Sequence, residues 1–120
     1  MRAIIIDAKK REVYEAEIDG DLKSMQGIVD GYIERATSPD DNTDLWVNEE
    51  GLMNGLPDFF TFEGAHQPFA GNGLLLGNAE HGEGVESAGL APAWTVDRVK
   101  AMVAFKTRAE LQEEFARLGM

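Results

Sequence analysis

The apolar residues of this 120-residue chain come in short runs that polar and glycine-rich segments separate. The first run, Ala3–Ile6, is rich in β-branched residues and ends at Asp7, which predicts a buried strand. This early run is far too short for the apolar core of a signal peptide or for a membrane span. Strand patterns recur at residues 12–18, 32–36, 45–48 and 73–76. The chain is therefore expected to build a sheet of about five short strands.

Helical patterns follow the first two predicted strands and recur near the C-terminus. Asp21 is a candidate N-cap, apolar residues follow it at helical spacing, and Gly31 can end the helix. Thr107 and Glu110 have the spacing of a capping box before another apolar stripe, which predicts the last helix. Residues 96–105 fit a short helix or a strand equally well, and both alternatives stay open.

Length and composition fit one domain over residues 1–120, with a hydrophobic content of 43%. We predict an α+β fold: a mixed or antiparallel sheet of about five strands, one helix after an N-terminal hairpin and one or two C-terminal helices. Turn-rich residues 37–43 and glycine-rich residues 78–92 predict long loops, and the former is expected to be the most mobile segment. Cysteine is absent, which excludes disulfides and thiol chemistry and is compatible with a cytoplasmic location.

Charge is distributed very unevenly along the chain. Residues 36–97 contain no lysine or arginine but hold eleven of the 22 aspartates and glutamates, and the net charge is −11. A field of one sign repels nucleic acids and membrane surfaces and attracts basic partners. We therefore expect a partner protein with a basic surface, and no direct contact with nucleic acid or membrane.

The acidic segment contains an incomplete calcium-binding pattern. Asp40, Asn42 and Asp44 occupy the first three ligand positions of an EF-hand loop. The sixth position is Leu45 where glycine is needed, and the twelfth is Gly51 where a bidentate glutamate is needed. A solvated acidic loop is the better interpretation.

Other catalytic and cofactor patterns are absent from the sequence. His66 and His81 could each join Glu63, Glu80 or Glu83 at a metal ion, but they lack the spacing of known metal-ligand motifs. The glycines of residues 71–77 superficially match a nucleotide-binding fingerprint, but Leu74–Leu76 is predicted to be a strand and no lysine is nearby. No nucleophile with an evident base is present. The sequence thus predicts no enzyme activity, no catalytic residue, no metal site and no cofactor.

Aromatic residues are concentrated in the segment without cations. Five of the ten lie between residues 46 and 69. Phe59 and Phe60 are adjacent and cannot both point inward along a regular strand, so one of them could anchor a partner. A core position for both is nevertheless the favoured interpretation.

The run Asn48–Pro57 (NEEGLMNGLP), the later segment Gly71–Gly77 (GNGLLLG) and the earlier Asp30–Glu34 (DGYIE) carry a family resemblance. Together they resemble a family of small uncharacterised proteins encoded by bacteriophages and plasmids, and the resemblance covers residues 2–77. That family has no established activity, so it implies no catalytic role. It implies an accessory protein that works by binding in the host cytoplasm, with Asn48, Glu49 and Glu50 as the better candidates for a shared site.

We therefore expect a non-enzymatic acidic binding protein of a phage or mobile element that acts on a host or phage protein. A DNA-mimic inhibitor of a nuclease or restriction-type defence system is the first alternative, and a metal-binding or small-molecule-binding protein is the second. The candidate protein-binding residues are Asp40, Asp41, Asp44, Glu49, Glu50, Asp58, Phe59 and Phe60.

Overall fold

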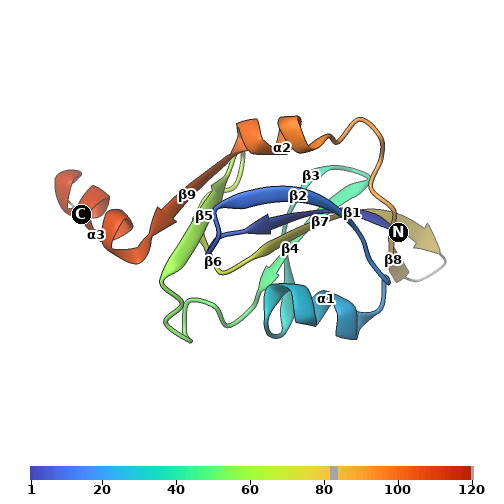
Figure 1. Ribbon diagram of the computed structural model, residues 1–120, viewed down its shortest axis with the longest axis horizontal. Coiled ribbons are helices and arrows are strands. Elements are labelled where there is room, and N and C mark those ends of the chain that lie inside the picture. Colours follow the sequence, from blue (N-terminus) through green and yellow to red (C-terminus); the bar gives the residue numbers. More distant parts are fainter. Residues whose placement is uncertain (82–83, 120) are drawn as a thin grey trace.

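The strands form two antiparallel sheets in the computed structural model, which describes residues 1–81 and 84–119 and the side chains of 1–78 and 87–119 (Figure 1). The larger sheet contains β1 (Arg2–Asp7), β2 (Glu12–Glu17), β3 (Ile33–Asp40), β4 (Thr43–Asn48), β7 (Gly73–His81) and β8 (Gly84–Ala88). The smaller sheet contains β5 (Asp58–Phe62), β6 (Phe69–Ala70) and β9 (Val103–Thr107). The helices are α1 (Leu22–Val29), α2 (Val96–Met102) and α3 (Arg108–Arg117).

The larger sheet has the strand order β2-β1-β7-β4-β3, so β2 and β3 lie at opposite edges. Gly77 of β7 is paired with Thr43 of β4 and with Ala88 of β8, which places β8 on the same side of β7 as β1. The N-terminal hairpin, the helix after it, and the antiparallel sheet confirm the predicted α+β fold. The structure adds a second sheet that the sequence patterns did not indicate.

The β3–β4 hairpin corrects the prediction of a loop at residues 37–43. β3 continues to Asp40 and β4 begins at Thr43, so only a tight turn joins the two strands. The Asp40 carboxylate accepts the backbone N–H of Asn42 at 2.9 Å, which stabilises that turn. Pro39 is compatible with this position because β3 is an edge strand. Residues 37–40, whose types favour turns, therefore belong to a strand.

A second correction concerns residues 78–92, which were predicted to be a long loop. β7 extends to His81, and β8 pairs with it from Gly84 to Ala88. A Cβ on Gly77 would lie 2.4 Å from the carbonyl oxygen of Gly89, so this glycine permits a close approach of two backbones. Residues 77–81 and 84–88 therefore pair as two antiparallel strands.

The helix boundaries agree with the predicted caps, with one difference. Asp21 accepts the Ser24 N–H at the start of α1, and Thr107 and Glu110 form the predicted capping box of α3. The left-handed residue that ends α1 is Asp30 (φ 62°), not Gly31. Both alternatives for residues 96–105 occur in succession, as α2 and then the start of β9.

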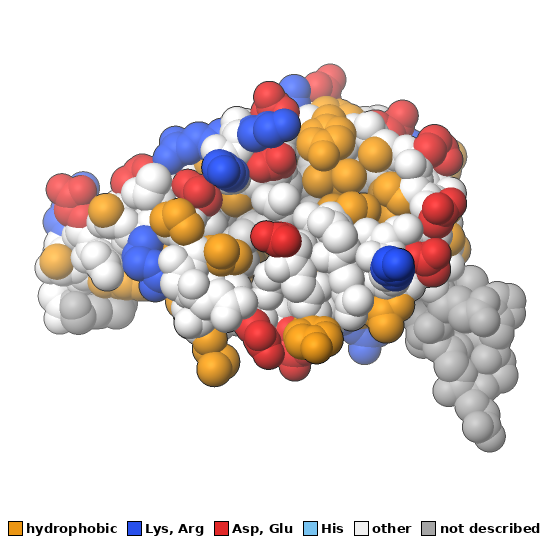
Figure 2. Space-filling model, turned by 60° about the horizontal axis from the view of Figure 1, so that its bottom comes forward, with side chains coloured by type: hydrophobic (Ala, Val, Ile, Leu, Met, Phe, Trp, Pro, Cys, Tyr) orange, Lys and Arg blue, Asp and Glu red, His pale blue; other side chains and the backbone are white. Residues whose placement is uncertain are grey.

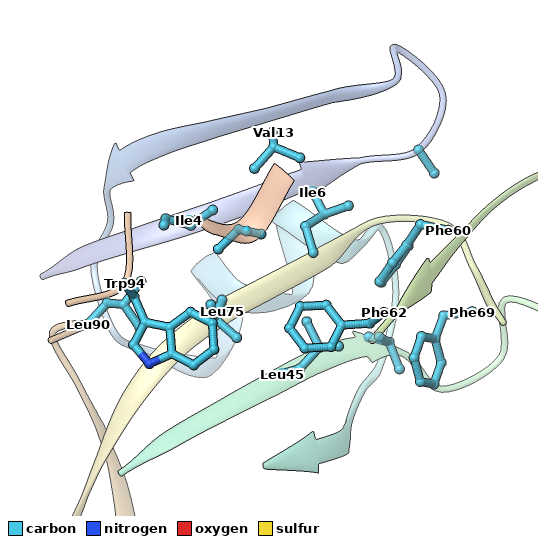
Figure 3. Packing of buried hydrophobic residues seen from close by; sticks show 13 residues of the cluster. Ile4, Ile6, Val13, Leu45, Phe60, Phe62, Phe69, Leu75, Leu90 and Trp94 are labelled. Carbon is cyan, nitrogen blue, oxygen red and sulfur yellow. The ribbon is translucent and has the colours of Figure 1, made fainter. Parts of the chain in front are cut away.

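The main core lies between one face of the larger sheet, the smaller sheet and α2 (Figures 1 and 3). Its buried members are Ile4, Ile6, Ala8, Val13, Leu45, Val47, Phe60, Phe62, Phe69, Leu75, Leu90, Trp94 and Val99. Figure 3 shows Trp94 and Leu90 at one end of this cluster and Phe60 and Phe69 at the other. Residues from the N-terminal strand and from the C-terminal third thus share one core.

The opposite face of the larger sheet is covered by α1. Met25 and Val29 pack there against Ile5 of β1 and Leu74 of β7, so β1 and residues 74–76 of β7 are buried on both faces. At the far end of the molecule, α3 buries only Leu111 (Figure 1). In the described part of the chain, no helix is long and apolar enough to cross a membrane.

Candidate protein-interaction surface

Asn48 joins the end of β4 to the end of α1. Its side-chain amide is buried and donates to the carbonyl oxygens of Val29 and Asp30, both at 3.1 Å. Its carbonyl oxygen accepts the backbone N–H of Glu50 at 2.8 Å. The last carbonyls of a helix have no partner within the helix, so Asn48 satisfies groups that would otherwise be exposed or unpaired. One side chain thereby fixes where the following turn begins.

Gly31 allows this contact because it has no Cβ. A Cβ at that position would lie 2.7 Å from Nδ2 of Asn48, closer than real Cβ atoms approach other atoms. The backbone N–H of Glu49 also donates to the carbonyl of Tyr32 at 2.8 Å. Residues 30–34 and 48–50, which the family resemblance singled out separately, are therefore in direct contact in the fold.

The turn at residues 49–57 presses against β6. A Cβ on Gly51 would lie 2.4 Å from the carbonyl oxygen of Ala70, and Gly55 has a left-handed φ of 70°. Backbone hydrogen bonds from Asn54 to Glu50 and from Leu56 to Gly51 close the turn. The outer side of the turn exposes 66% of Leu52 and 88% of Met53.

These segments expose carboxylates and apolar side chains side by side. The exposed residues are Asp30, Tyr32, Glu34, Glu49, Glu50, Leu52 and Met53, and we call them the acidic–apolar surface. Figure 2 shows acidic side chains adjoining hydrophobic ones along the lower edge of the face that it presents. Tyr32 is 63% exposed, more than the exposed aromatic residues Tyr14 (41%) and Phe115 (47%). Apolar groups with an acidic rim are typical of a contact site for a basic protein surface.

The predicted site residues are divided between this surface and other places. Glu49 and Glu50 belong to it, whereas Asp40 and Asp41 lie at the far tip of the β3–β4 hairpin. Six residues of β4 at about 3.3 Å each separate the two acidic pairs by roughly 20 Å. Asp58 is half-buried at the start of β5. Among the predicted site residues, the exposed carboxylates therefore form two separate groups.

Asp44 is buried, with 1% of its surface exposed. Its carboxylate accepts hydrogen bonds from the Ser38 hydroxyl at 2.6 Å and the Asn78 amide at 3.1 Å, and a guanidinium nitrogen of Arg35 lies 4.0 Å away. A buried charge needs such partners to compensate for lost hydration. Asp44 thus joins β3, β4 and β7 and is not available to a partner protein.

Asp40 has a structural contact in addition to its exposure at the hairpin tip. It accepts the indole N–H of Trp94 at 3.0 Å, and the guanidinium of Arg98 stacks 3.7 Å from the Trp94 ring centre. The Thr43 hydroxyl beside it, the Asn42 backbone amide and this indole N–H lower the pKa of Asp40 below its usual value. This carboxylate therefore links the hairpin to the segment that precedes α2.

Phe59 and Phe60 are both buried, on opposite faces of β5. Phe60 is fully buried in the main core and lies 5.4 Å from the Phe69 ring centre. Phe59 packs against Leu111 of α3, which covers the face of β5 that would otherwise be open. Neither ring can anchor a partner of the folded chain. Tyr32, Leu52 and Met53 are instead exposed apolar side chains near Glu49 and Glu50, and only their apolar character within a turn-rich segment could have indicated them.

The structure does not assemble the histidines and carboxylates of the described residues into a metal site. Among those residues, no group of three or more side chains with metal-binding atoms comes together. His66 is exposed in the connection between β5 and β6. The side chains of Glu80, His81, Glu83 and Glu86 lie outside the described ones.

A comparison with protein-family models matches residues 1–93 to the Domain of unknown function (DUF3846). The match includes β1 to β8, α1 and every residue of the acidic–apolar surface. It leaves out α2, β9 and α3. Neither the curated proteins nor the solved structures contain a match. Because the matched region covers most of the sequence, the chain belongs to the DUF3846 family.

Proposed function

We propose that this protein is a non-enzymatic binding protein that engages a basic surface on another protein through its acidic–apolar surface. The observation that carries the proposal is the exposure of Tyr32 and Met53, at 63% and 88%, directly beside exposed Glu49 and Glu50. Exposed apolar side chains with a polar rim mark contact sites on many proteins.

Charge and apolar contact have different tasks in this mechanism. The net charge of −11 attracts a basic partner over a distance, and the carboxylates select its orientation. Burial of Tyr32, Leu52 and Met53 then slows dissociation, because apolar and aromatic anchors supply most of the binding energy at such sites. Binding is therefore expected to weaken as salt screens the attraction between the charges of the two proteins.

The partner is proposed to be a host or phage protein in the cytoplasm of the host cell. This context comes from the resemblance of residues 30–34, 48–57 and 71–77 to small phage-encoded and plasmid-encoded proteins. The description of the family matched over residues 1–93 assigns no activity.

DNA mimicry is the weaker form of the same proposal. A DNA mimic needs carboxylates arrayed along one face like phosphates. Asp44 is buried, and Asp40 and Asp41 lie at the other end of the hairpin from Glu49 and Glu50. The combination of apolar and acidic groups favours a protein surface over a DNA channel as the binding target.

The test compares two charge-reversal variants of equal net charge. Glu49→Lys/Glu50→Lys changes the acidic–apolar surface, and the control Asp19→Lys/Glu113→Lys changes two exposed carboxylates elsewhere. Each protein is immobilised and exposed to lysate of the cell in which its gene occurs, and captured proteins are identified and then purified for affinity measurement. We expect the wild type and the control to bind the same basic protein, and the Glu49/Glu50 variant to bind it at least about tenfold more weakly.

Two results would contradict the proposal. One is equal binding by both variants, which would place the interface elsewhere. The other is an affinity that does not change between about 50 and 500 mM salt, because exposed charges are screened over that range. Competition between the protein and duplex DNA for a captured nuclease would instead support the mimicry alternative.

A further inference from the structure

We infer that a cleft between β2, α2 and β9 binds a small anionic molecule with an apolar body. This site is separate from the acidic–apolar surface, because β2 and β3 form opposite edges of the larger sheet. It lies beside residues 9–11 and 100–108, two segments that contain lysines and arginines but no aspartate or glutamate.

The fold brings the two basic ends of the chain together. Residues 9–11 and 100–108 contain six of the eleven lysines and arginines. The guanidinium of Arg11 donates to the carboxylate of Glu110 at 2.9 Å, which fixes the hairpin turn against the start of α3. Figure 2 shows several basic side chains gathered in the upper left of the face that it presents. Arg11 and Lys106 pair with Glu110 and Glu114, so the other cations of these two segments remain for further contacts.

The cleft opens within this region and has a volume of about 400 Å³. It is lined by Arg11, Glu12, Val13, Tyr14, Lys100 and Phe105. A volume of this size is within the range of small-molecule sites, which is about 300–1,000 Å³.

Positive charge exceeds negative charge in the described lining. Arg11 and Lys100 face a single lining carboxylate, Glu12. Only one guanidinium nitrogen of Arg11 is used by Glu110, and a guanidinium has five N–H donors. Lys100 is exposed and takes part in no ion pair among the described residues. Both cations can therefore bind a carboxylate or phosphate group.

The rest of the lining is Val13, Phe105 and the exposed Tyr14. Val13 is 7% exposed and belongs to the main core, and Phe105 packs against that same core. Such a wall favours the burial of an aromatic or aliphatic group next to the anion. The matching ligand is a monoanion or dianion attached to a compact apolar body, and not a bare inorganic anion.

Phenyl phosphate, benzoate, inorganic phosphate and phenol are suitable probes, with binding followed at backbone amides by NMR. We expect phenyl phosphate or benzoate to cause saturable shifts at residues 11–14 and 100–105, inorganic phosphate to bind more weakly, and phenol to cause no shifts. The relative affinities of phenyl phosphate and benzoate distinguish a phosphate ligand from a carboxylate ligand. Lys100→Glu is expected to weaken binding by about tenfold, which corresponds to about 1.4 kcal/mol.

The matched control is Lys23→Glu on α1, which makes the same charge change at another exposed lysine. It is expected to leave the affinity unchanged, and the spectra report directly whether each variant is folded. The inference is overturned if shifts do not saturate, if they occur throughout the chain, or if both lysine variants weaken binding equally. Equal affinity for phosphate and phenyl phosphate would also overturn it, because the apolar wall would then contribute nothing.

Discussion

The contact between Gly31 and Asn48 gives a quantitative test of how the acidic–apolar surface is built. Asn48 makes three hydrogen bonds to backbone groups of residues 29, 30 and 50. At a net value of about 1 kcal/mol each, Asn48→Ala is expected to lower the free energy of unfolding by about 3 kcal/mol. Asn54→Ala, which truncates an exposed asparagine in the same turn, is expected to change it by less than about 0.5 kcal/mol.

Gly31→Ala tests the same contact from the other side. The added methyl group would lie 2.7 Å from Nδ2 of Asn48, so this substitution is expected to cost about 1–3 kcal/mol in the wild-type background. With alanine at position 48 the colliding atoms are gone, and Gly31→Ala is expected to cost close to nothing. The two substitutions should therefore be non-additive by about 1–3 kcal/mol.

Urea unfolding of the wild type, both single variants and the double variant, followed by circular dichroism, measures this coupling. Additive effects of the two substitutions would refute the reasoning, because they would mean that Gly31 is needed for some reason other than the Asn48 side chain. A cost below about 1 kcal/mol for Asn48→Ala would show that its three hydrogen bonds are replaced by water.

Two further predictions concern glycine positions and pH. Gly51→Ala should lower the free energy of unfolding by at least about 1–3 kcal/mol, because its methyl group would meet the backbone of Ala70. Gly27→Ala should raise the free energy of unfolding by about 0.5–1 kcal/mol, because there is open space around this position of α1. Thermal unfolding of the two variants checks both predictions. The lowered pKa of Asp40 means that its contribution to stability is present above its usual pKa of 3.8 and is lost as pH falls through the folded value. Asp40→Asn should therefore make the free energy of unfolding less sensitive to acid. The difference should be less than about 1 kcal/mol, because this carboxylate is exposed. An unchanged dependence of stability on pH would contradict the stabilising role of the Asp40 carboxylate.

Local sequence patterns predicted the parts of the fold that depend on local chemistry. The β-branched run at the start of the chain is β1, Asp21 caps α1, and Thr107 begins α3 with its capping box. These features need only a strand preference or a side chain that reaches a backbone N–H a few residues away. They could be predicted because no distant segment has to be placed first.

The candidate site could be predicted only in part. Glu49 and Glu50 were identified because they are polar residues in a run with a family resemblance, and they are exposed. Asp44 has the same charge and lies in the same acidic segment, yet its carboxylate is buried and accepts hydrogen bonds from Ser38 and Asn78. Residue type and charge density do not distinguish these cases, because burial depends on which strand lies next to the residue.

By itself, the sequence determined the α+β class, the helix caps, the first strand and the excess of negative charge. Tertiary structure decided that the basic ends of the chain meet at one cleft. It also decided that Phe59 and Phe60 are buried, whereas Tyr32 and Met53 are among the exposed apolar residues. The tertiary structure also explains why residues 31 and 51 are glycines, since each allows close approach to a distant segment. The physical reason is that strand pairing and packing join residues far apart in the chain, and local propensity carries no information about those partners.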